Sequence, residues 1–269
     1  ISFDHTKSLG DTIEKIAFEK AGILKENTPL VLGKLPPNAE KVIVRVAQEK
    51  HIPVLISEKD FRVENVKIDA NGTSFDYISD DLKLEKVTVN LLGKHQSANA
   101  AVAITAFKIF MRNTNREFDE KKVRSALNQI DWVGRMQIIS HHPTVIVDGA
   151  HNEEGINSLK ENLLEIFPKK KIYFVFAILR DKNLESIIRD ICAVSYKVYI
   201  SKNHSQRAAE IEEQLEIVKK YHSNYEVIND VVEATRTAIS QAGDNDIVLV
   251  AGSLYTISEV LKVKDSIKN

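Results

Sequence analysis

The sequence has a single cysteine and no long apolar run. Cys192 cannot form a disulfide within the chain, and it follows Ile187, Ile188 and Ile191, so we interpret it as a small buried apolar residue and not as a reactive thiol. A chain without internal disulfides is typical of a reducing compartment. No apolar run approaches the roughly 18 residues that span a bilayer, and the first residues carry no signal-peptide pattern. The sequence therefore predicts a cytoplasmic protein with no membrane partner.

Glycine, proline and net charge are also scarce. Ten glycines and six prolines among 269 residues are too few for a collagen-like or linker-like polymer. The 37 basic and 38 acidic side chains leave a formal charge of −1, so the chain lacks the positive surface expected of a nucleic-acid-binding protein. The length suffices to bury a large apolar core. We expect a soluble monomer of one or two domains that binds no nucleic acid.

The first half of the chain mixes helical and strand patterns. Apolar residues recur at helical spacing in four segments, residues 12–20, 38–50, 96–111 and 119–130. Short apolar strands at 29–32 and 54–56 flank the second of these helices and predict a βαβ unit. Between residues 61 and 90 the apolar period falls to near two, and Asn71-Gly72 predicts a hairpin turn. This stretch therefore favours an antiparallel sheet.

The second half alternates short apolar strands with amphipathic helices. The expected strands are residues 144–147, 172–177, 197–200, 225–228 and 247–251. The expected helices are residues 156–167, 184–194, 208–221, 231–242 and 257–263. Such alternation predicts a mostly parallel sheet with helices on both faces. Residues 131–135 interrupt the pattern, so we place a domain boundary there and expect domains at 1–132 and 133–269.

Polar clusters follow three of these strands directly. They are Asp148-Gly149-Ala150-His151-Asn152, Arg180-Asp181-Lys182 and Gly252-Ser253. Ligands of open parallel sheets bind beyond the carboxyl ends of the strands, and all three clusters fall on that edge. The sequence therefore predicts a ligand site at this edge of the second domain.

The common nucleotide-binding motifs are absent. Neither GxxxxGK[ST] nor GxGxxG occurs, so the chain alone shows no complete nucleotide cradle, and a dinucleotide-dependent dehydrogenase is disfavoured. The spacing of Asp148 and His151 also occurs in transition-metal sites, but no third ligand accompanies the pair, which argues against zinc.

Five motifs in chain order resemble the folylpolyglutamate synthases, ATP-dependent amide ligases of the Mur ligase superfamily. They are Asp4-His5 with Leu9-Gly10-Asp11-Thr12, Ile16-Ala17-Phe18-Glu19-Lys20-Ala21-Gly22-Ile23, Leu92-Gly93-Lys94-His95-Gln96 with Asn99-Ala100, Trp132-Val133-Gly134-Arg135, and Asp148-Gly149-Ala150-His151-Asn152. Each motif is weak by itself, but the ordered set covers nearly the whole chain. The resemblance implies an α/β fold: the C-terminal part of a P-loop ATPase domain of the Mur ligase central type, followed by a Rossmann-like, mostly parallel, glutamate-binding domain.

The resemblance begins inside the ATPase domain, because the P-loop is missing and Ile1 is not a methionine. We therefore expect a C-terminal fragment that is inactive alone. The pteridine pocket would lie mainly in the absent portion.

The resemblance also implies roles on the magnesium and nucleotide side. His5 would bind Mg²⁺, and Lys20 would bind it as a carbamate, since a carbamate turns a cation into the anionic oxygen donor that this metal prefers. Burial of the Lys20 amine would assist carbamoylation. Asn99 would contact the adenine through its amide, Arg135 would bind the terminal phosphates, and Asp148 would lie near the ATP. A surface lysine, a helix-packing asparagine and a hinge salt bridge are the simpler readings of Lys20, Asn99 and Arg135.

On the substrate side, the resemblance places His151 near the phosphate or the incoming amino acid. Lys182 and Ser253 would hold the carboxylates of that amino acid, although Arg180 offers a second cation and Lys182 is equally well read as a loop charge. We count Lys20, Arg135 and His151 as the expected catalytic residues.

The implied reaction adds L-glutamate to the γ-carboxylate of folate through an acyl phosphate, with ATP and Mg²⁺. Two alternatives remain open. One is a bifunctional enzyme that is also a dihydrofolate synthase, and the other is a non-catalytic module that binds an acidic amino acid or a partner protein. A ligase of peptidoglycan precursors is disfavoured, since His95-Gln96 stands where a His-Asn pair is expected.

Overall fold

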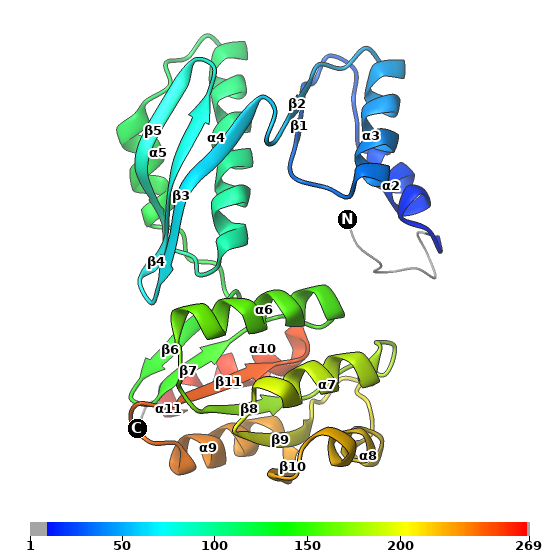
Figure 1. Cartoon of the computed structure of the whole chain (residues 1–269), viewed down its shortest axis with the longest axis vertical. Helices are drawn as coiled ribbons and strands as arrows, with labels where there is room; N and C mark the ends of the chain where they lie inside the picture. Colours follow the sequence, from blue (N-terminus) through cyan, green and yellow to red (C-terminus); the bar gives the residue numbers. More distant parts are fainter. Residues whose placement is uncertain (1–9, 268–269) are drawn as a thin grey trace. The chain divides into compact units, whose positions relative to one another are not determined.

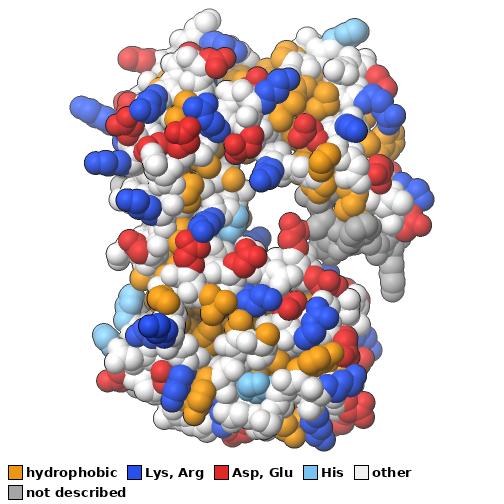
Figure 2. All heavy atoms as spheres, in the orientation of Figure 1, with side chains coloured by type: hydrophobic (Ala, Val, Ile, Leu, Met, Phe, Trp, Pro, Cys, Tyr) orange, Lys and Arg blue, Asp and Glu red, His pale blue; other side chains and the backbone are white. Residues whose placement is uncertain are grey.

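The computed structural model describes residues 10–267, and its contacts divide the chain into two compact units (Figure 1). Unit 1 comprises residues up to 90 and residues 94–130, and unit 2 comprises residues 91–93 and 131 onward. Basic and acidic side chains are interspersed over the visible face of each unit (Figure 2), so neither face presents a field of one sign. Within residues 10–267, no helix combines the length and the apolar character needed to cross a bilayer.

One part of unit 1 is the predicted βαβ unit with a helix beside it. Its elements are α2 (Ile13–Ala21), β1 (Leu30–Leu32), α3 (Pro37–Glu49) and β2 (Val54–Ile56). The two strands pair in parallel, and α3 connects them. Thr12 starts α2, because its hydroxyl oxygen accepts a hydrogen bond from the Lys15 backbone N–H at 3.2 Å. The buried faces of α2 and α3 meet around Ala17, Ala21 and Ile43.

The other part of unit 1 is a three-stranded antiparallel sheet packed against a long helix. Its elements are β3 (Phe61–Asp69), β4 (Gly72–Ser79), β5 (Leu82–Val89), α4 (Lys94–Asn113) and α5 (Glu120–Asn128). Gly72 begins β4 with a φ of +141°, and a Cβ atom there would lie 2.6 Å from the Val89 carbonyl oxygen, so only glycine fits. The buried Tyr77 and Thr105 hydroxyls share a hydrogen bond of 2.9 Å that joins β4 to α4. The predicted hairpin is confirmed.

Unit 2 is built on a six-stranded sheet with strand order β10-β9-β8-β11-β7-β6. Its strands are β6 (Gln137–His141), β7 (Thr144–Val147), β8 (Ile172–Phe176), β9 (Lys197–Lys202), β10 (Tyr225–Asp230) and β11 (Ile247–Ala251). Its helices are α6 (Glu153–Ile166), α7 (Leu184–Val194), α8 (Ile211–Tyr221), α9 (Val231–Gln241), α10 (Leu254–Lys262) and α11 (Lys264–Ile267). All neighbouring strands pair in parallel except β6, which is antiparallel to β7. The mostly parallel α/β fold is confirmed.

Alternate residues of the central strands enter two separate cores. In β8, Phe174 and Phe176 face the core that contains residues of α6, α7 and α8, whereas Tyr173 and Val175 face the core that contains residues of α9, α10 and α11. Both faces of the sheet are therefore covered. Cys192 is buried in the first core, and burial raises the pKa of its thiol to about 12, as expected for an inert cysteine.

The order of the strands creates a switch point beside β11. The helix that follows β8 packs on one face of the sheet, and the helix that follows β11 packs on the other. The connections therefore diverge at the carboxyl ends of these neighbouring strands, which is where α/β proteins hold their ligands. This places the loops after β7, β8 and β11 around one position.

In unit 2, the sequence analysis did not predict the edge strand β6 and placed the start of α10 too late. Residues 137–141 form the edge strand β6, although their short apolar run resembles a loop. Helix α10 begins at Leu254, three residues before the expected start, because Ser253 caps it. A side-chain cap is decided by one hydrogen bond, which the apolar period does not reveal.

Candidate functional site

Asp148, at the end of β7, is a buried carboxylate that organises the surrounding backbone. Its Oδ2 accepts a hydrogen bond from the Met136 N–H and its Oδ1 one from the Ala150 N–H, each at 2.7 Å. Burial raises the pKa of this carboxyl above its usual value, while the two N–H donors oppose the rise. The side chain is 8% exposed. Asp148 therefore fixes the position of residues 134–136 against the strand end.

Arg135 is held in place through its backbone on both sides. The Gly134 carbonyl oxygen accepts a hydrogen bond from the Gly149 N–H at 2.8 Å, and the Met136 N–H donates to Asp148. Both flanking residues have a positive φ, 74° at Gly134 and 42° at Met136, so the chain turns sharply here. The Arg135 side chain is exposed while its backbone is pinned.

His151 lies in the loop between β7 and α6. Its Nδ1 lies 2.8 Å from the Gly149 carbonyl oxygen, which can only accept, so Nδ1 carries the proton. In the neutral ring the lone pair is then on Nε2. This arrangement suits a side chain that accepts a proton or meets a ligand donor through Nε2.

The β8–α7 loop carries the two cations expected to meet a carboxylate. Arg180 donates from its guanidinium to the Gln206 carbonyl oxygen at 2.7 Å, which ties it to the β9–α8 loop. Lys182 is half-buried and lies in a turn, where its backbone N–H donates to the Leu179 carbonyl oxygen at 3.1 Å. Asp181 between them pairs with Arg207 at 2.7 Å. The loop is therefore cross-linked to the next strand connection.

Ser253, at the start of α10, lies within a buried network and is 1% exposed. Its Oγ accepts a hydrogen bond from the Thr256 N–H at 3.0 Å, as a helix cap does. The Thr256 hydroxyl donates to the Ala177 carbonyl oxygen at 2.7 Å, and the Ser253 and Thr256 hydroxyls lie 2.7 Å apart. Because the single Thr256 hydroxyl hydrogen goes to Ala177, Ser253 must donate its own hydrogen to Thr256. The Ser253 hydroxyl is thus engaged inside the protein.

In unit 1, Asn99 lies exposed near the start of α4. Its Nδ2 donates to Oε1 of the buried Gln96 at 3.1 Å, and the Gln96 amide nitrogen lies 2.9 Å from His95 Nε2. The bond to Gln96 fixes the orientation of the Asn99 amide, with Nδ2 directed toward Gln96. The Asn99 side chain therefore presents an oriented amide at the surface.

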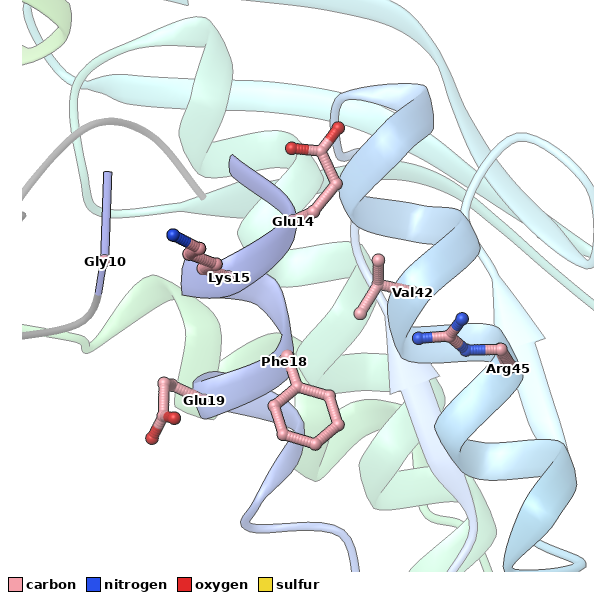
Figure 3. Close-up of a pocket in the computed structure, with 7 residues that line it drawn as sticks. All are labelled: Gly10, Glu14, Lys15, Phe18, Glu19, Val42 and Arg45. Carbon is pink, nitrogen blue, oxygen red and sulfur yellow. The ribbon is translucent and has the colours of Figure 1, made fainter. Parts of the chain in front are cut away.

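Lys20 lies on the last turn of α2 and is exposed, so the burial that would assist its carbamoylation is not found in this structure. His5 lies outside the described residues. Beside Lys20, residues of α2 and α3 line a shallow pocket of about 430 Å³, in which Phe18 of α2 lies on the side that faces Val42 and Arg45 of α3 (Figure 3). Lys20 does not line this pocket.

No cluster of three or more His, Cys, Asp or Glu side chains suited to a metal ion occurs within residues 10–267. Both Asp148 oxygens are engaged by backbone N–H groups, so this carboxylate is not a preformed metal ligand.

The β9–α8 loop contains a polar residue that the sequence analysis missed. Asn203, 3% exposed, donates from Nδ2 to Thr256 Oγ1 at 3.0 Å and to Ser253 Oγ at 3.2 Å. Asn203 is the first residue after β9, and Ser253 is the second after β11, so the rule applied to three strand ends would also have found Asn203 at a fourth. The Lys197–Lys202 strand runs two residues beyond its expected end, which hid the position.

His204, the next residue, clamps the same loop to α10. Its backbone N–H and its Nδ1 lie 2.8 and 2.9 Å from the two carboxylate oxygens of Glu259. The hydrogen bond and charge of Glu259 raise the pKa of His204 above its usual value, with Asp230 adding to the rise and Lys262 opposing it. The charged pair thus stabilises the fold at pH values at which His204 is protonated.

We expect the contribution of this pair to depend on pH. Because the folded-state pKa is raised, the stabilisation is complete below about pH 6.5, the ordinary histidine value, and is lost as the pH rises through the folded-state pKa. The difference in melting temperature between the wild type and Glu259→Gln should therefore be about 1–2 °C at pH 5.5, a small effect because His204 is exposed, and it should fall to a smaller, constant difference at pH 9. Thermal unfolding at both pH values tests this, and a difference that grows with pH would contradict it.

Comparisons with known proteins agree across both units. Residues 1–107 match the Mur ligase middle domain, and residues 134–254 match the Mur ligase glutamate ligase domain. The dihydrofolate synthase/folylpolyglutamate synthase of Bacillus subtilis is 33% identical over 265 residues, covering 97% of this chain and 60% of that protein. The chain thus spans about 60% of the length of the curated relatives that it matches.

Solved structures show the same likeness. The crystal structure of folylpolyglutamate synthase from Thermotoga maritima is 32% identical with a TM-score of 0.81, covering 96% of this chain and 59% of that one. A structure from Escherichia coli in complex with DHPP and ADP is 28% identical with a TM-score of 0.85, covering 99% and 60%.

Proposed function

The chain belongs to the folylpolyglutamate synthase family of the Mur ligases, and on that basis we propose that it serves an ATP-dependent ligase that joins L-glutamate to the γ-carboxylate of a folate. The observation that carries the proposal is the edge of the unit 2 sheet, where Asp148 and His151 follow β7 and Lys182 follows β8, the two strands that flank β11 at the switch point. This edge offers cations and a basic imidazole in the unit that matches the glutamate ligase domain.

ATP supplies the phosphoryl group that activates the folate carboxylate as an acyl phosphate. Arg135 binds the terminal phosphates, since its exposed guanidinium fork suits phosphoryl oxygens and its pinned backbone keeps it oriented. Asn99 receives the adenine through the amide that Gln96 orients. Asp148 acts beside the nucleotide by holding the backbone that carries Arg135.

The unit 2 edge receives the incoming glutamate. Lys182 pairs with one of its carboxylates, and the turn at Ser253 shapes the same position from β11. His151 meets the attacking amine, because an acceptor Nε2 can take the proton that the amine loses when the amide forms. The amide bond forms as the phosphate leaves, and the proton passes to the imidazole.

For magnesium, the described donor set is incomplete. His5 lies outside the described residues, and Lys20 would have to carry a carbamate to supply anionic oxygens. We propose these two residues as the protein ligands, with phosphate oxygens and water supplying the other donors.

The test is ADP release by the completed chain, defined as this chain joined to the portion of the Bacillus subtilis relative that it does not span. We expect ADP release that requires both a folate and L-glutamate, with the glutamate found in amide linkage by mass spectrometry. A different result would favour a non-catalytic binding module. In that case the chain alone would bind glutamate in a calorimeter, but the completed chain would show no catalytic activity. Release of ADP with dihydropteroate as acceptor would add the dihydrofolate synthase activity that the name of the Bacillus relative includes.

A further inference from the structure

Three strand connections of unit 2 meet in one closed hydrogen-bond network. Asn203 follows β9, Ala177 follows β8, and Ser253 and Thr256 follow β11. Asn203, Ser253 and Thr256 are each no more than 3% exposed. Their bonds therefore form where water does not compete, so each missing partner would leave a buried polar group unsatisfied.

The hydrogens in this network can be assigned completely. The Thr256 hydroxyl donates to the Ala177 carbonyl oxygen at 2.7 Å, so Ser253 donates to Thr256. The two hydrogens on Asn203 Nδ2 go to the two nearer acceptors, Thr256 Oγ1 at 3.0 Å and Ser253 Oγ at 3.2 Å, while the Ala177 carbonyl oxygen lies farther from Nδ2 at 3.5 Å. Each hydroxyl oxygen then has both lone pairs occupied, since Ser253 Oγ also accepts the Thr256 N–H.

Asn203 joins the β9–α8 loop to the start of α10. Its Oδ1 accepts the Ser205 N–H at 3.0 Å, which orients the amide so that Nδ2 points to α10. Thr256 ties this helix start to the end of β8 through Ala177, and Asn203 ties it to the β9–α8 loop across 50 residues of sequence. Only an amide provides the acceptor and the two donors that this position uses.

We propose that Asn203 is a positioning residue that holds the Gly252–Ser253 turn and the start of α10 in the shape that admits the incoming amino acid. The inference rests on the proposed function of the unit 2 edge and deepens it. Ser253 then contributes through the shape of the turn, because its hydroxyl hydrogen is already donated to Thr256. Gly252 is held equally tightly: its φ is +115°, and a Cβ atom there would lie 2.8 Å from the Ala177 carbonyl oxygen.

The first measurement is hydrogen exchange of the peptide that covers residues 252–258. In Asn203→Ala, the Thr256 amide loses support for its acceptor, and we expect its exchange to speed up about tenfold, as a local opening does. Thr256→Val removes the hydroxyl that Ser253 and Asn203 share and should act in the same direction. Thr256→Ser keeps that hydroxyl and should restore nearly wild-type exchange.

The second measurement separates positioning from general stability. In the completed chain, Asn203→Ala should raise KM for L-glutamate about tenfold, the equivalent of one lost set of buried hydrogen bonds, while KM for ATP stays within about twofold. The matched control is Asn162→Ala in α6. Asn162 is another buried asparagine, but its amide donates to the Ser158 carbonyl oxygen at 2.7 Å within its own helix.

The outcomes separate the two proposals. Faster exchange with a selective rise in glutamate KM, absent from Asn162→Ala, supports the role of Asn203. Unchanged exchange in both Asn203→Ala and Thr256→Val, or the same rise in glutamate KM in Asn162→Ala, overturns it. If the wild-type completed chain releases no ADP in response to glutamate, the proposed function fails, and the exchange measurement still decides whether Asn203 holds the turn.

Discussion

Replacing Arg135 with alanine is expected to lower kcat for ADP release by the completed chain about 1000-fold, the effect typical of an arginine that neutralises charge in phosphoryl transfer. The Arg135 side chain is exposed, so we expect its removal to leave the stability of the folded protein unchanged. Its position is nevertheless fixed, because Gly134 and Met136 on either side bond to the end of β7. The backbone that carries the side chain is therefore positioned before the phosphate binds, which lowers the cost of placing the guanidinium there.

Controls for Arg135 distinguish charge, geometry and stability. Arg135→Lys keeps the charge but loses the planar fork, and we expect it to recover only part of the rate. Arg189→Ala removes an exposed arginine of α7 whose nearest acid, Asp190, is 3.9 Å away, and it should leave kcat unchanged. Rates of ADP release at saturating ATP, folate and glutamate provide the comparison. A kcat for Arg135→Ala within threefold of wild type would remove this residue from the proposed mechanism.

The second large effect is on stability. Asp148→Ala should lower the free energy of unfolding by about 2–4 kcal/mol, because the Met136 and Ala150 N–H groups would be buried without an acceptor. The loss of a costly buried charge offsets part of this penalty. For a unit of this size the melting temperature should fall by about 5–15 °C. Thermal unfolding followed by circular dichroism would measure it.

Asp148→Asn tests the same argument at constant shape. The amide offers one acceptor and one donor, so one backbone N–H would face another donor, and we expect a loss of stability nearly as large as for alanine. Asp190→Ala is the matched control, since Asp190 forms a partly exposed ion pair with Lys160 at 3.1 Å and should cost less than about 1 kcal/mol. Equal stabilities for the Asp148 and Asp190 variants would show that the two backbone bonds contribute nothing.

The sequence pattern predicts the fold of unit 2 well because its strands are buried on both faces. Continuous apolar runs such as residues 172–176 allow no other placement, and the amphipathic helices between them need a sheet to cover. The edge strand β6 escaped prediction for the opposite reason. It has a neighbour on one side only, so its residues are half-buried and carry no distinct period.

The position of the site could be predicted from the sequence, but the hydrogen bonds that its residues form could not. The rule on strand ends locates Asp148, Lys182 and Ser253 at one edge of the sheet. The rule does not reveal that Asp148 and Ser253 form their hydrogen bonds within the protein. Those bonds depend on which N–H and hydroxyl groups lie nearby in three dimensions. The role of Asn203 depends on the same three-dimensional accounting.

The placement of β11 also governs when unit 2 acquires its core during synthesis. This strand is the last of the sheet to be synthesised, yet it lies between β7 and β8. The edges of β7 and β8 that face β11 pair with β11 alone. Until residue 251 has left the ribosome, the nascent polypeptide therefore carries two half-sheets with exposed hydrogen-bonding edges. Chaperone binding to ribosome-bound chains should accordingly persist up to this length and decline once β11 inserts.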